Sequence, residues 1–283
     1  MNEREARRRG AEFRDMHARG TFVLANPWDI GSARMLEHLG FRGLATTSAG
    51  HAFSMGKRDG DGAISRDEAL AHAKLLLDAT AVPITADLEN GYGRSPEAVA
   101  ETIRRAGAIG LSGASIEDAT LGDAEPLYER GLAVERVRAA VEAARSLPQP
   151  FLLTARAENF VRGRPDVDDA LGRLAAYAAA GADVICAPFL PDEDAIRRAC
   201  AIGLPVHYIA GRTRFTVAQL AGMGVRRITV GASFARAALA AARRAAREIL
   251  DRGTFDAFDG LPTISDFNEL IDPRESISPT SSG

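Results

Sequence analysis

Two carboxylates stand two positions apart in the stretch ADLENGYG, residues 86–93, directly before a Gly-Tyr-Gly turn. Side chains two apart on a strand share a face, so Asp87 and Glu89 can project together while Leu88 faces the other way. Two anionic groups this close repel each other unless a cation or a proton intervenes. The pair therefore favours a metal-binding strand end over one that is merely solvated.

Polar side chains also end the next two predicted strands. Ser115 and Glu117 share a face at the end of one, and Arg156 stands two residues before Glu158 at the end of the other. Carboxylates and hydroxyls are hard oxygen ligands, suited to Mg²⁺ or Mn²⁺ that keeps several waters. The guanidinium fork of Arg156 suits a carboxylate or a phosphate. The set predicts a site that binds a small dianionic oxo acid and stabilises an enolate beside the metal.

Several nearby residues have a structural reading beside the functional one. Asp118 and Glu158 could cap helices or pair with arginines. His51 and His207 lie near strand ends and could act as bases, although a lone histidine there is more often structural. Cys186 has apolar neighbours, which is more typical of a buried inert thiol than of a nucleophile.

Short apolar stretches alternate with amphipathic ones from near residue 21 to near residue 250. The eight expected strands are 21–26, 43–48, 82–87, 109–117, 151–156, 182–188, 205–210 and 226–231. The stretches between them repeat apolar residues at helical spacing. Left-handed glycines are expected just past the ends of five helices, at Gly40, Gly107, Gly181, Gly203 and Gly224. This pattern predicts an α/β fold, a (β/α)8 TIM-type barrel, whose site lies at the C-terminal ends of the strands.

We expect residues 1–253 to form a single barrel domain that begins with an extra helix near residues 1–18. Residues 254–283 would be a C-terminal extension with a flexible end, because the last residues are polar and rich in proline and serine.

Composition excludes several classes of protein. A formal charge of −3 and the lack of a long apolar run argue against nucleic-acid and membrane partners. The charged N-terminus and the two cysteines predict a cytoplasmic protein without a disulfide framework. The only lysines, Lys57 and Lys74, fall in a predicted loop and a predicted helix, which disfavours a Schiff-base aldolase. Zinc is also disfavoured, because the acidic cluster lacks paired histidine or cysteine ligands.

The motifs TTSAG…SMGKRDG, ADLENGYG, GASIED and TARAEN, in this order and spacing, resemble the isocitrate lyase and phosphoenolpyruvate mutase superfamily. The resemblance runs from about residue 20 to 253. It implies a barrel in a homo-oligomer, a tetramer or a dimer, with the C-terminal helix exchanged between subunits. It also implies a Mg²⁺ cofactor, with Mn²⁺ as the alternative, and a small-molecule carboxylate substrate. The bond made or broken would be a C–C or P–C bond next to the oxo group.

The resemblance also implies roles for residues that contact the oxo acid. Ser48, with the backbone of Ala49 and Gly50, would bind the oxo acid. Asp59 matches the aspartate that closes the SMGKRD segment, so we prefer it to Asp61, which is more typical of a turn.

The same resemblance implies a metal site and a catalytic set. Asp87 would be the direct Mg²⁺ ligand, and Glu89 and Glu117 would hold the metal directly or through its waters. Arg156 would bind the substrate carboxylate or stabilise the enolate oxygen. The implied catalytic residues are thus Asp59, Glu117 and Arg156.

This sequence departs from both well-known branches of the superfamily. Lyases of isocitrate and methylisocitrate carry a Lys-Lys/Arg-Cys-Gly-His stretch after the IED motif, and the mutases carry Lys and Asn-Ser there. Residues 119–131, ATLGDAEPLYERG, contain none of these motifs. Pro188 and Phe189 follow the sixth strand, where the lyases place a glutamate. We therefore expect an enolate-forming lyase, by C–C cleavage or decarboxylation, with phosphonomutase or phosphonopyruvate hydrolase chemistry as the alternative.

Two hypotheses from other classes remain. The segments 210–214 and 230–234 offer glycines, arginines and a helix start after strands seven and eight, as in phosphate-binding barrel isomerases. A non-catalytic binding barrel is the other. Loss of catalysis would give no reason to keep the acidic residues and Arg156 on one rim. The proton donor is not identified; Tyr92, His51 and a metal-bound water are the alternatives.

Overall fold

The computed structural model describes residues 1–122, 124–211 and 213–271 of the chain. Its eight strands are all parallel to their neighbours. They are β1 (Phe22–Val23), β2 (Leu44–Ala45), β3 (Ile84–Asp87), β4 (Gly113–Glu117), β5 (Leu152–Arg156), β6 (Val184–Cys186), β7 (His207–Ile209) and β8 (Arg227–Thr229). All eight lie within the stretches predicted as strands.

The strands form two sheets that join into a barrel. One sheet has the order β1-β8-β7 and the other runs from β2 to β6. Isolated parallel bridges, Ala25 with Leu44 and Ile185 with Val206, connect the two sheets at both edges. The ring of eight strands is therefore complete, and the predicted (β/α)8 barrel is confirmed.

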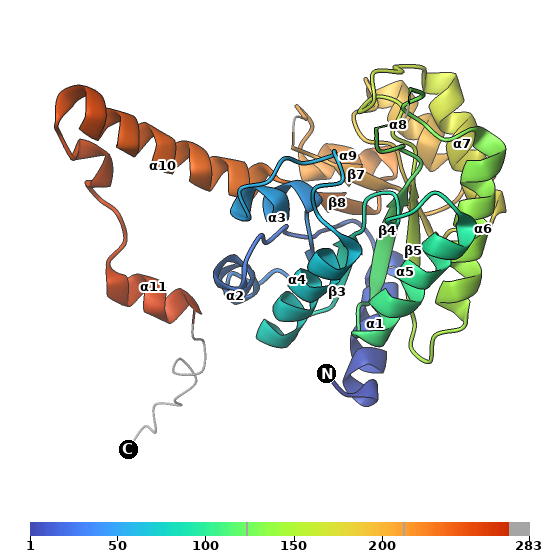
Figure 1. The fold of residues 1–283 in the computed structure, drawn as a ribbon, viewed down its shortest axis with the longest axis horizontal. Coiled ribbons are helices and arrows are strands. Elements are labelled where there is room, and N and C mark those ends of the chain that lie inside the picture. Colours follow the sequence, from blue (N-terminus) through green and yellow to red (C-terminus); the bar gives the residue numbers. More distant parts are fainter. Residues whose placement is uncertain (123, 212, 272–283) are drawn as a thin grey trace.

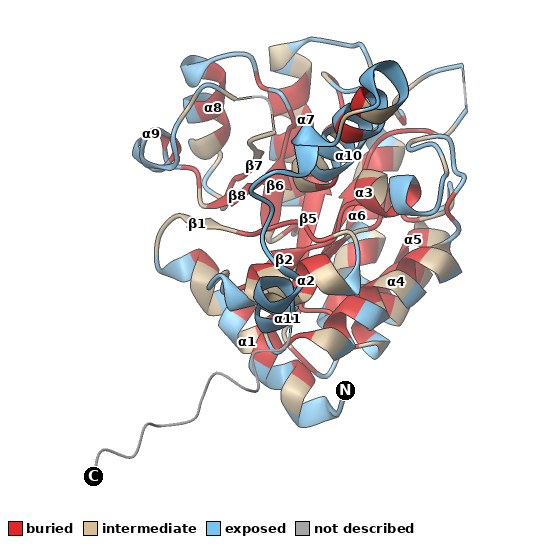
Figure 2. Cartoon of the chain, turned by 90° about the vertical axis from the view of Figure 1, so that its left-hand side faces the viewer, coloured by how far each residue is buried: buried red, intermediate tan, exposed pale blue. Residues whose placement is uncertain are grey.

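Helices cover the outside of the barrel (Figure 1). They are α1 (Glu3–Ala18), α2 (Ile30–His38), α3 (Ser48–Ser54), α4 (Arg66–Ala79), α5 (Pro96–Ala108), α6 (Arg130–Arg145), α7 (Val167–Ala179), α8 (Glu193–Cys200), α9 (Val217–Met223), α10 (Ser233–Arg252) and α11 (Ile264–Ile271), with a 3-10 turn at Asp256–Phe258. Figure 2 shows buried residues gathered on the strands and on the inner faces of the helices. No described helix is long and apolar enough to cross a membrane.

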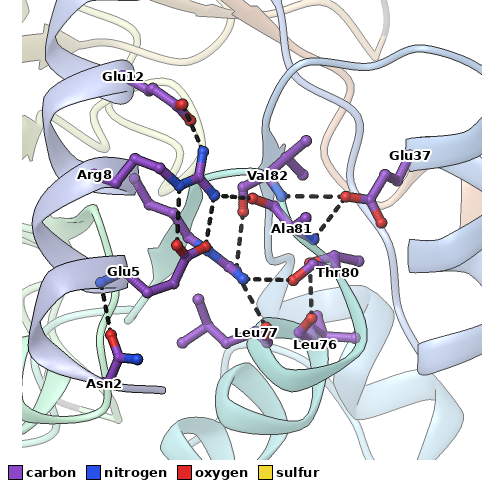
Figure 3. Close-up of polar contacts among 11 residues, drawn as sticks. Asn2, Glu5, Arg8, Glu12, Glu37, Leu76, Leu77, Thr80, Ala81 and Val82 are labelled. Atoms are coloured by element: carbon purple, nitrogen blue, oxygen red, sulfur yellow. Dashed lines mark hydrogen bonds and ion pairs between the residues drawn. The ribbon is translucent and has the colours of Figure 1, made fainter.

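Helix α1, the predicted extra helix, closes the N-terminal end of the barrel. Phe13 is fully buried there and packs with Leu24, Ala45 and Leu152 from three strands or strand ends. Arg8 donates from Nη2 to the Ala81 carbonyl at 2.9 Å, among the contacts that tie α1 to the loop before β3 (Figure 3). Apolar contact and charge-assisted hydrogen bonds together fix this helix beneath the strands.

The chain leaves the barrel through α10, which extends away from it in Figure 1. Helix α11 then returns to contact α2. This C-terminal arm, residues 233–271, is mostly exposed (Figure 2). Its exposed large apolar residues are Leu239, Leu250, Phe255, Phe258, Leu261, Ile264, Phe267 and Ile271. The predicted flexible end of the 254–283 extension falls largely on residues 272–283, which lie outside the described residues.

Candidate active site

A cavity of about 500 Å³ opens at the C-terminal ends of the strands. Predicted site residues that line it are Ser48, Ala49, Asp59, Asp87, Glu89, Glu117 and Arg156. Two larger cavities, of about 640 and 570 Å³, lie elsewhere, the first at the opposite end of the barrel. We assign the active site by its converging charged groups and its position on the strand ends, because size alone does not single it out.

Arg156 is the centre of this cavity's charge network. It ends β5, is buried, and pairs with a carboxylate at each of three nitrogens. Nη1 lies 3.1 Å from Asp87, Nη2 lies 2.9 Å from Glu117, and Nε lies 2.8 Å from Glu158. Burial alone would lower the pKa of Arg156, but the charges of these carboxylates raise it well above its usual value. The guanidinium is thus always charged and rigidly held, and these three carboxylates account for three of its five N–H groups among the described residues.

The strand register explains why these groups meet. Glu117 and Arg156 are direct neighbours across β4 and β5, while Asp87 ends β3 opposite Ser115. Burial raises the pKa of Glu117, against the opposing charge of Arg156. Asp87 at the end of β3 and Glu117 at the end of β4 therefore both contact the guanidinium of Arg156.

Ser48 lies directly beside Asp87, as the first residue of α3. Its Oγ donates to Asp87 Oδ2 at 3.0 Å, and its backbone N–H donates to the same oxygen at 3.3 Å. Gly50 is not in the cavity lining; its N–H donates to Thr47 Oγ1 at 3.2 Å and caps the helix. The structure therefore places Ser48 and Ala49 at the cavity, while the role of the Gly50 backbone stays a prediction.

Asp59 faces the same group of carboxylates. Burial, followed by the charge of Asp87, raises the pKa of Asp59, and a hydrogen bond from Ser48 opposes that shift. Asp61 is exposed instead and accepts a hydrogen bond from the backbone of Ala63, as a turn residue does. These placements support Asp59 over Asp61 as the site residue.

Glu89 has the features of a carboxylate that is held for a cation. It follows β3 in a left-handed conformation (φ 46°), which is unusual for a residue other than glycine. Its Oε2 is buried and has no hydrogen-bond partner among the described residues. Burial, and then the charges of Asp87 and Asp59, raise its pKa to about 7. A nearby cation would offset each of these costs.

The donor set fits Mg²⁺ that retains water. Within the described ranges, no three His, Cys, Asp or Glu side chains gather closely enough to enclose a metal ion. Mg²⁺, however, usually keeps several waters and takes only one or two carboxylates from the protein. Asp87 and Glu89 offer such a pair of oxygen donors, and Glu117 lies on the same cavity.

The sequence reasoning missed several residues of the lining. Glu158 was left open between capping and pairing, and the structure shows it buried against Arg156. Phe53, Val161 and Phe189 add an exposed apolar part to the cavity. They come from separate loops or helices, so no single motif could have grouped them.

Most of the residues for which the sequence allowed either a structural or a functional role have the structural role. Asp118 accepts hydrogen bonds from Tyr177 at 2.6 Å, Arg173 at 3.1 Å and the Glu158 N–H at 2.8 Å, which fixes the ends of β4 and β5. Cys186 is buried, and burial raises the pKa of its thiol to about 12, so it is inert. His51 stacks on His72 with 4.0 Å between ring centroids, outside the cavity lining.

Fold and site together define a barrel enzyme with an acidic, arginine-centred rim, and known proteins agree. The family model for phosphoenolpyruvate phosphomutase matches residues 13–250. The structure of a "putative lyase/mutase" from Burkholderia cenocepacia J2315 is 46% identical, with a TM-score of 0.91 over 98% of each chain. Phosphoenolpyruvate phosphomutase of Streptomyces hygroscopicus is 30% identical over 91% of this chain and 85% of its own. Oxaloacetate decarboxylase of Chromohalobacter salexigens is 30% identical over 81% of each.

The chain therefore belongs to the phosphoenolpyruvate phosphomutase family of the isocitrate lyase/PEP mutase superfamily. The members of this superfamily are lyases and mutases that act on small oxo acids, and the chain is an enzyme of this kind. The resemblance read from the motifs is confirmed.

Proposed function

We propose that this protein is a Mg²⁺-dependent lyase that acts on a small α-oxo or α-hydroxy carboxylic acid through a pyruvate-type enolate. Mn²⁺ would serve as an alternative metal. The observation that carries the proposal is Arg156, held by Asp87, Glu117 and Glu158 at the mouth of the barrel with free N–H donors.

Different residues of the cavity would bind the substrate and stabilise the charge that develops on it. Arg156 orients a substrate carboxylate and balances the negative charge that develops on the enolate oxygen. Ser48, at the start of α3, donates its hydroxyl to Asp87 in the free protein and would turn that donor to the oxo acid when the substrate binds. Asp87, Glu89 and Glu117 would hold the cation, which when bound stabilises the charge of the enolate. Asp59 completes the acidic side of the cavity.

Carbon–carbon cleavage or decarboxylation fits the chain better than phosphorus–carbon chemistry. Relatives of about equal similarity bear the names of a decarboxylase and of a phosphomutase, so similarity does not decide between them. The segment 119–131 lacks the Lys and Asn-Ser of the mutase branch and also the Cys motif of the isocitrate and methylisocitrate lyases. It therefore disfavours the mutase reaction and the cleavage of those two tricarboxylic acids, and leaves other enolate-forming lyase reactions open. Phosphonomutase or phosphonopyruvate hydrolase chemistry is therefore the second candidate.

Ligand binding tests the proposal before any activity is found. Oxalate mimics the pyruvate enolate, so Mg²⁺ with oxalate should raise the melting temperature progressively with oxalate concentration. Mg²⁺ with phosphate should leave it unchanged. A shift with phosphate alone would instead support the phosphate-binding isomerase, and no shift with either ligand would remove the carboxylate ring as the site.

We further propose a cytoplasmic homo-oligomer, a tetramer or a dimer, in which the C-terminal arm is exchanged between subunits. The support is the arm's row of exposed apolar side chains, which a partner subunit would cover. Light scattering on the full chain and on a chain ended after Ala232, which lacks the whole arm, should show loss of the oligomer in the shortened chain. An unchanged mass would contradict the exchange.

A further inference from the structure

Arg227 lies in the core of the barrel and forms no ion pair with a carboxylate of the described residues. Arg227, the first residue of β8, is 1% exposed. Its Nη2 donates to Thr154 Oγ1 at 2.7 Å and to His207 Nδ1 at 3.0 Å. Nε and Nη1 are buried and find no hydrogen-bond partner among the described residues. The ring of Phe13, 5.8 Å from Cζ, adds only a weak cation–π contact.

The neighbours of Arg227 also present hydrogen-bond donors. His207 accepts from Arg227 at Nδ1, so its proton sits on Nε2, which lies 2.8 Å from Thr229 Oγ1. Thr229 accepts that bond and keeps its own hydroxyl proton for another acceptor. Burial, and then the charge of Arg227, hold the pKa of His207 well below its usual value, so the ring is neutral. Burial lowers the pKa of Arg227 only to about 10, so this group stays charged near neutral pH.

These side chains line a recess of about 40 Å³ beneath the active site. The volume holds about three waters, or one small ion with a water, because one water needs about 10–15 Å³ by this measure. The ionised side chains on its lining are Asp87, Arg156 and Arg227. Arg156 is already paired with Asp87, Glu117 and Glu158, whereas Arg227 pairs with no carboxylate among the described residues. A buried cation is unfavourable unless an acceptor or an anion pairs with it.

We propose that this recess binds a small monovalent inorganic anion of the halide class against Arg227 and Thr229. The unused N–H groups of Arg227 and the free hydroxyl proton of Thr229 are donors, so they need an acceptor rather than another donor. A single negative charge would balance the charge of Arg227. The site lies below the level of the oxo-acid cavity and does not depend on which reaction the enzyme catalyses.

Thermal unfolding of the full chain in sodium chloride and in sodium isethionate, at equal ionic strength, tests this site. Isethionate is too large for the recess and has no carboxylate that could bind in the oxo-acid cavity. The melting temperature should rise by about 3 °C at ten times the dissociation constant of chloride, and above that constant it should keep rising with the logarithm of the chloride concentration. Arg227→Met should abolish the difference between the salts. Arg226→Met, which changes the half-buried neighbouring arginine, should keep it.

Bromide gives a direct readout that does not depend on any variant folding. A crystal of the wild-type protein grown in sodium bromide should show an anomalous peak within hydrogen-bonding distance of Arg227. Equal melting temperatures in the two salts, together with no bromide peak, would show that the recess holds only water and would overturn the proposal. If Arg227→Met does not fold, Thr229→Val replaces it and should weaken the chloride effect.

Discussion

At the scale of single residues, the site depends on how one guanidinium is shared. Three carboxylates fix the plane of the Arg156 guanidinium. The direction of its remaining N–H groups is therefore set by the protein before the substrate binds. Lysine keeps the charge but cannot make three planar contacts at once.

Arg156→Lys should therefore lower kcat/KM by about 100-fold or more. It should also weaken the binding of oxalate in the presence of Mg²⁺. Steady-state kinetics and titration calorimetry would measure the two effects. Arg164→Lys, which changes an exposed arginine paired with Glu125, is the matched control and should behave as wild type. Full activity in Arg156→Lys would rule out the role given to this residue.

Glu89 makes a second prediction at this scale, because its unpaired buried oxygen carries a cost when no cation is bound. Glu89→Gln should leave the melting temperature of the metal-free protein unchanged or raise it. The same variant should lose most of the stabilisation that Mg²⁺ gives to wild type. Melting curves with and without Mg²⁺ would measure both. A Mg²⁺ response equal to that of wild type would exclude Glu89 from the metal site.

The sequence predicted the acidic residues of the site but not how each is held. Asp87 and Glu89 were expected on one face of one strand. Both reach the cavity, yet β3 ends at Asp87, and Glu89 arrives there through a turn with positive φ. The alternation of side chains along a strand correctly predicted that Glu89 faces the cavity, although the backbone at Glu89 is not extended. The spacing of the two carboxylates could not reveal the turn, because it contains no information on the backbone angles.

At the scale of elements, two buried contacts connect helices to strands: the rings around His17 and the ion pair of Asp118 with Arg173. His17 in α1 lies edge-on to Phe13 and Phe22, each at 4.8 Å between ring centroids. Burial, and then the charge of Arg227, lower the pKa of His17 from 6.5 to about 3.

The pKa of His17 predicts loss of stability in acid. In the unfolded chain His17 binds a proton below about pH 6.5, whereas in the folded chain it binds one only below about pH 3. The contribution of His17 to the free energy of unfolding is therefore fully present above pH 6.5 and is lost as the pH falls from 6.5 to 3. His17→Phe should make the fall less steep, by up to a few kcal/mol at pH 4. Urea unfolding at several pH values would measure this. His38→Gln, at an exposed histidine, should keep the wild-type slope. An unchanged slope in His17→Phe would contradict the buried neutral ring.

The pair of Asp118 and Arg173 joins β4 to α7. Arg173→Leu should destabilise the protein by about 3 kcal/mol, because it removes the cation from a buried carboxylate. Arg130→Leu, at a more exposed partner of Asp169, should cost less than about 1 kcal/mol. Equilibrium unfolding in urea would compare them. Equal, small losses would mean that the Asp118 charge does not need Arg173.

The prediction of helices and strands succeeded where the apolar residues repeat regularly. It failed where tertiary packing determines the local structure. The eight strands were all predicted, but the predicted strand 43–48 runs into Ser48, where α3 begins, and α11 was not recognised within the 254–283 extension. Gly107 was expected as a left-handed cap and is wrong. It lies inside α5, and Gly110 takes the positive φ instead. A Cβ at Gly107 would come 2.4 Å from the side chain of Leu147, which follows α6, so this close contact within the chain explains that glycine.

At the scale of the whole molecule, closure of the barrel brings together residues that are far apart in the sequence. Ser48, Asp87, Glu117 and Arg156 lie on one rim because consecutive parallel strands end at the same edge. The direction of the strands was predictable. The inward position of Arg227 was not predictable, because Arg226 and Arg227 stand side by side at the start of the predicted strand 226–231 and only the register decides which one enters the core.

The central claim is that this rim forms a pyruvate-type enolate with the help of Mg²⁺. The most direct measurement is Mg²⁺-dependent release of pyruvate from oxaloacetate, substituted malates, phosphonopyruvate and tricarboxylic acids, each compared with Asp87→Asn. The account predicts release from at least one of the oxo or hydroxy acids, and none from that acid in Asp87→Asn. Release that persists in Asp87→Asn, or silence across the panel in a protein that also fails to bind Mg²⁺ with oxalate, would contradict it.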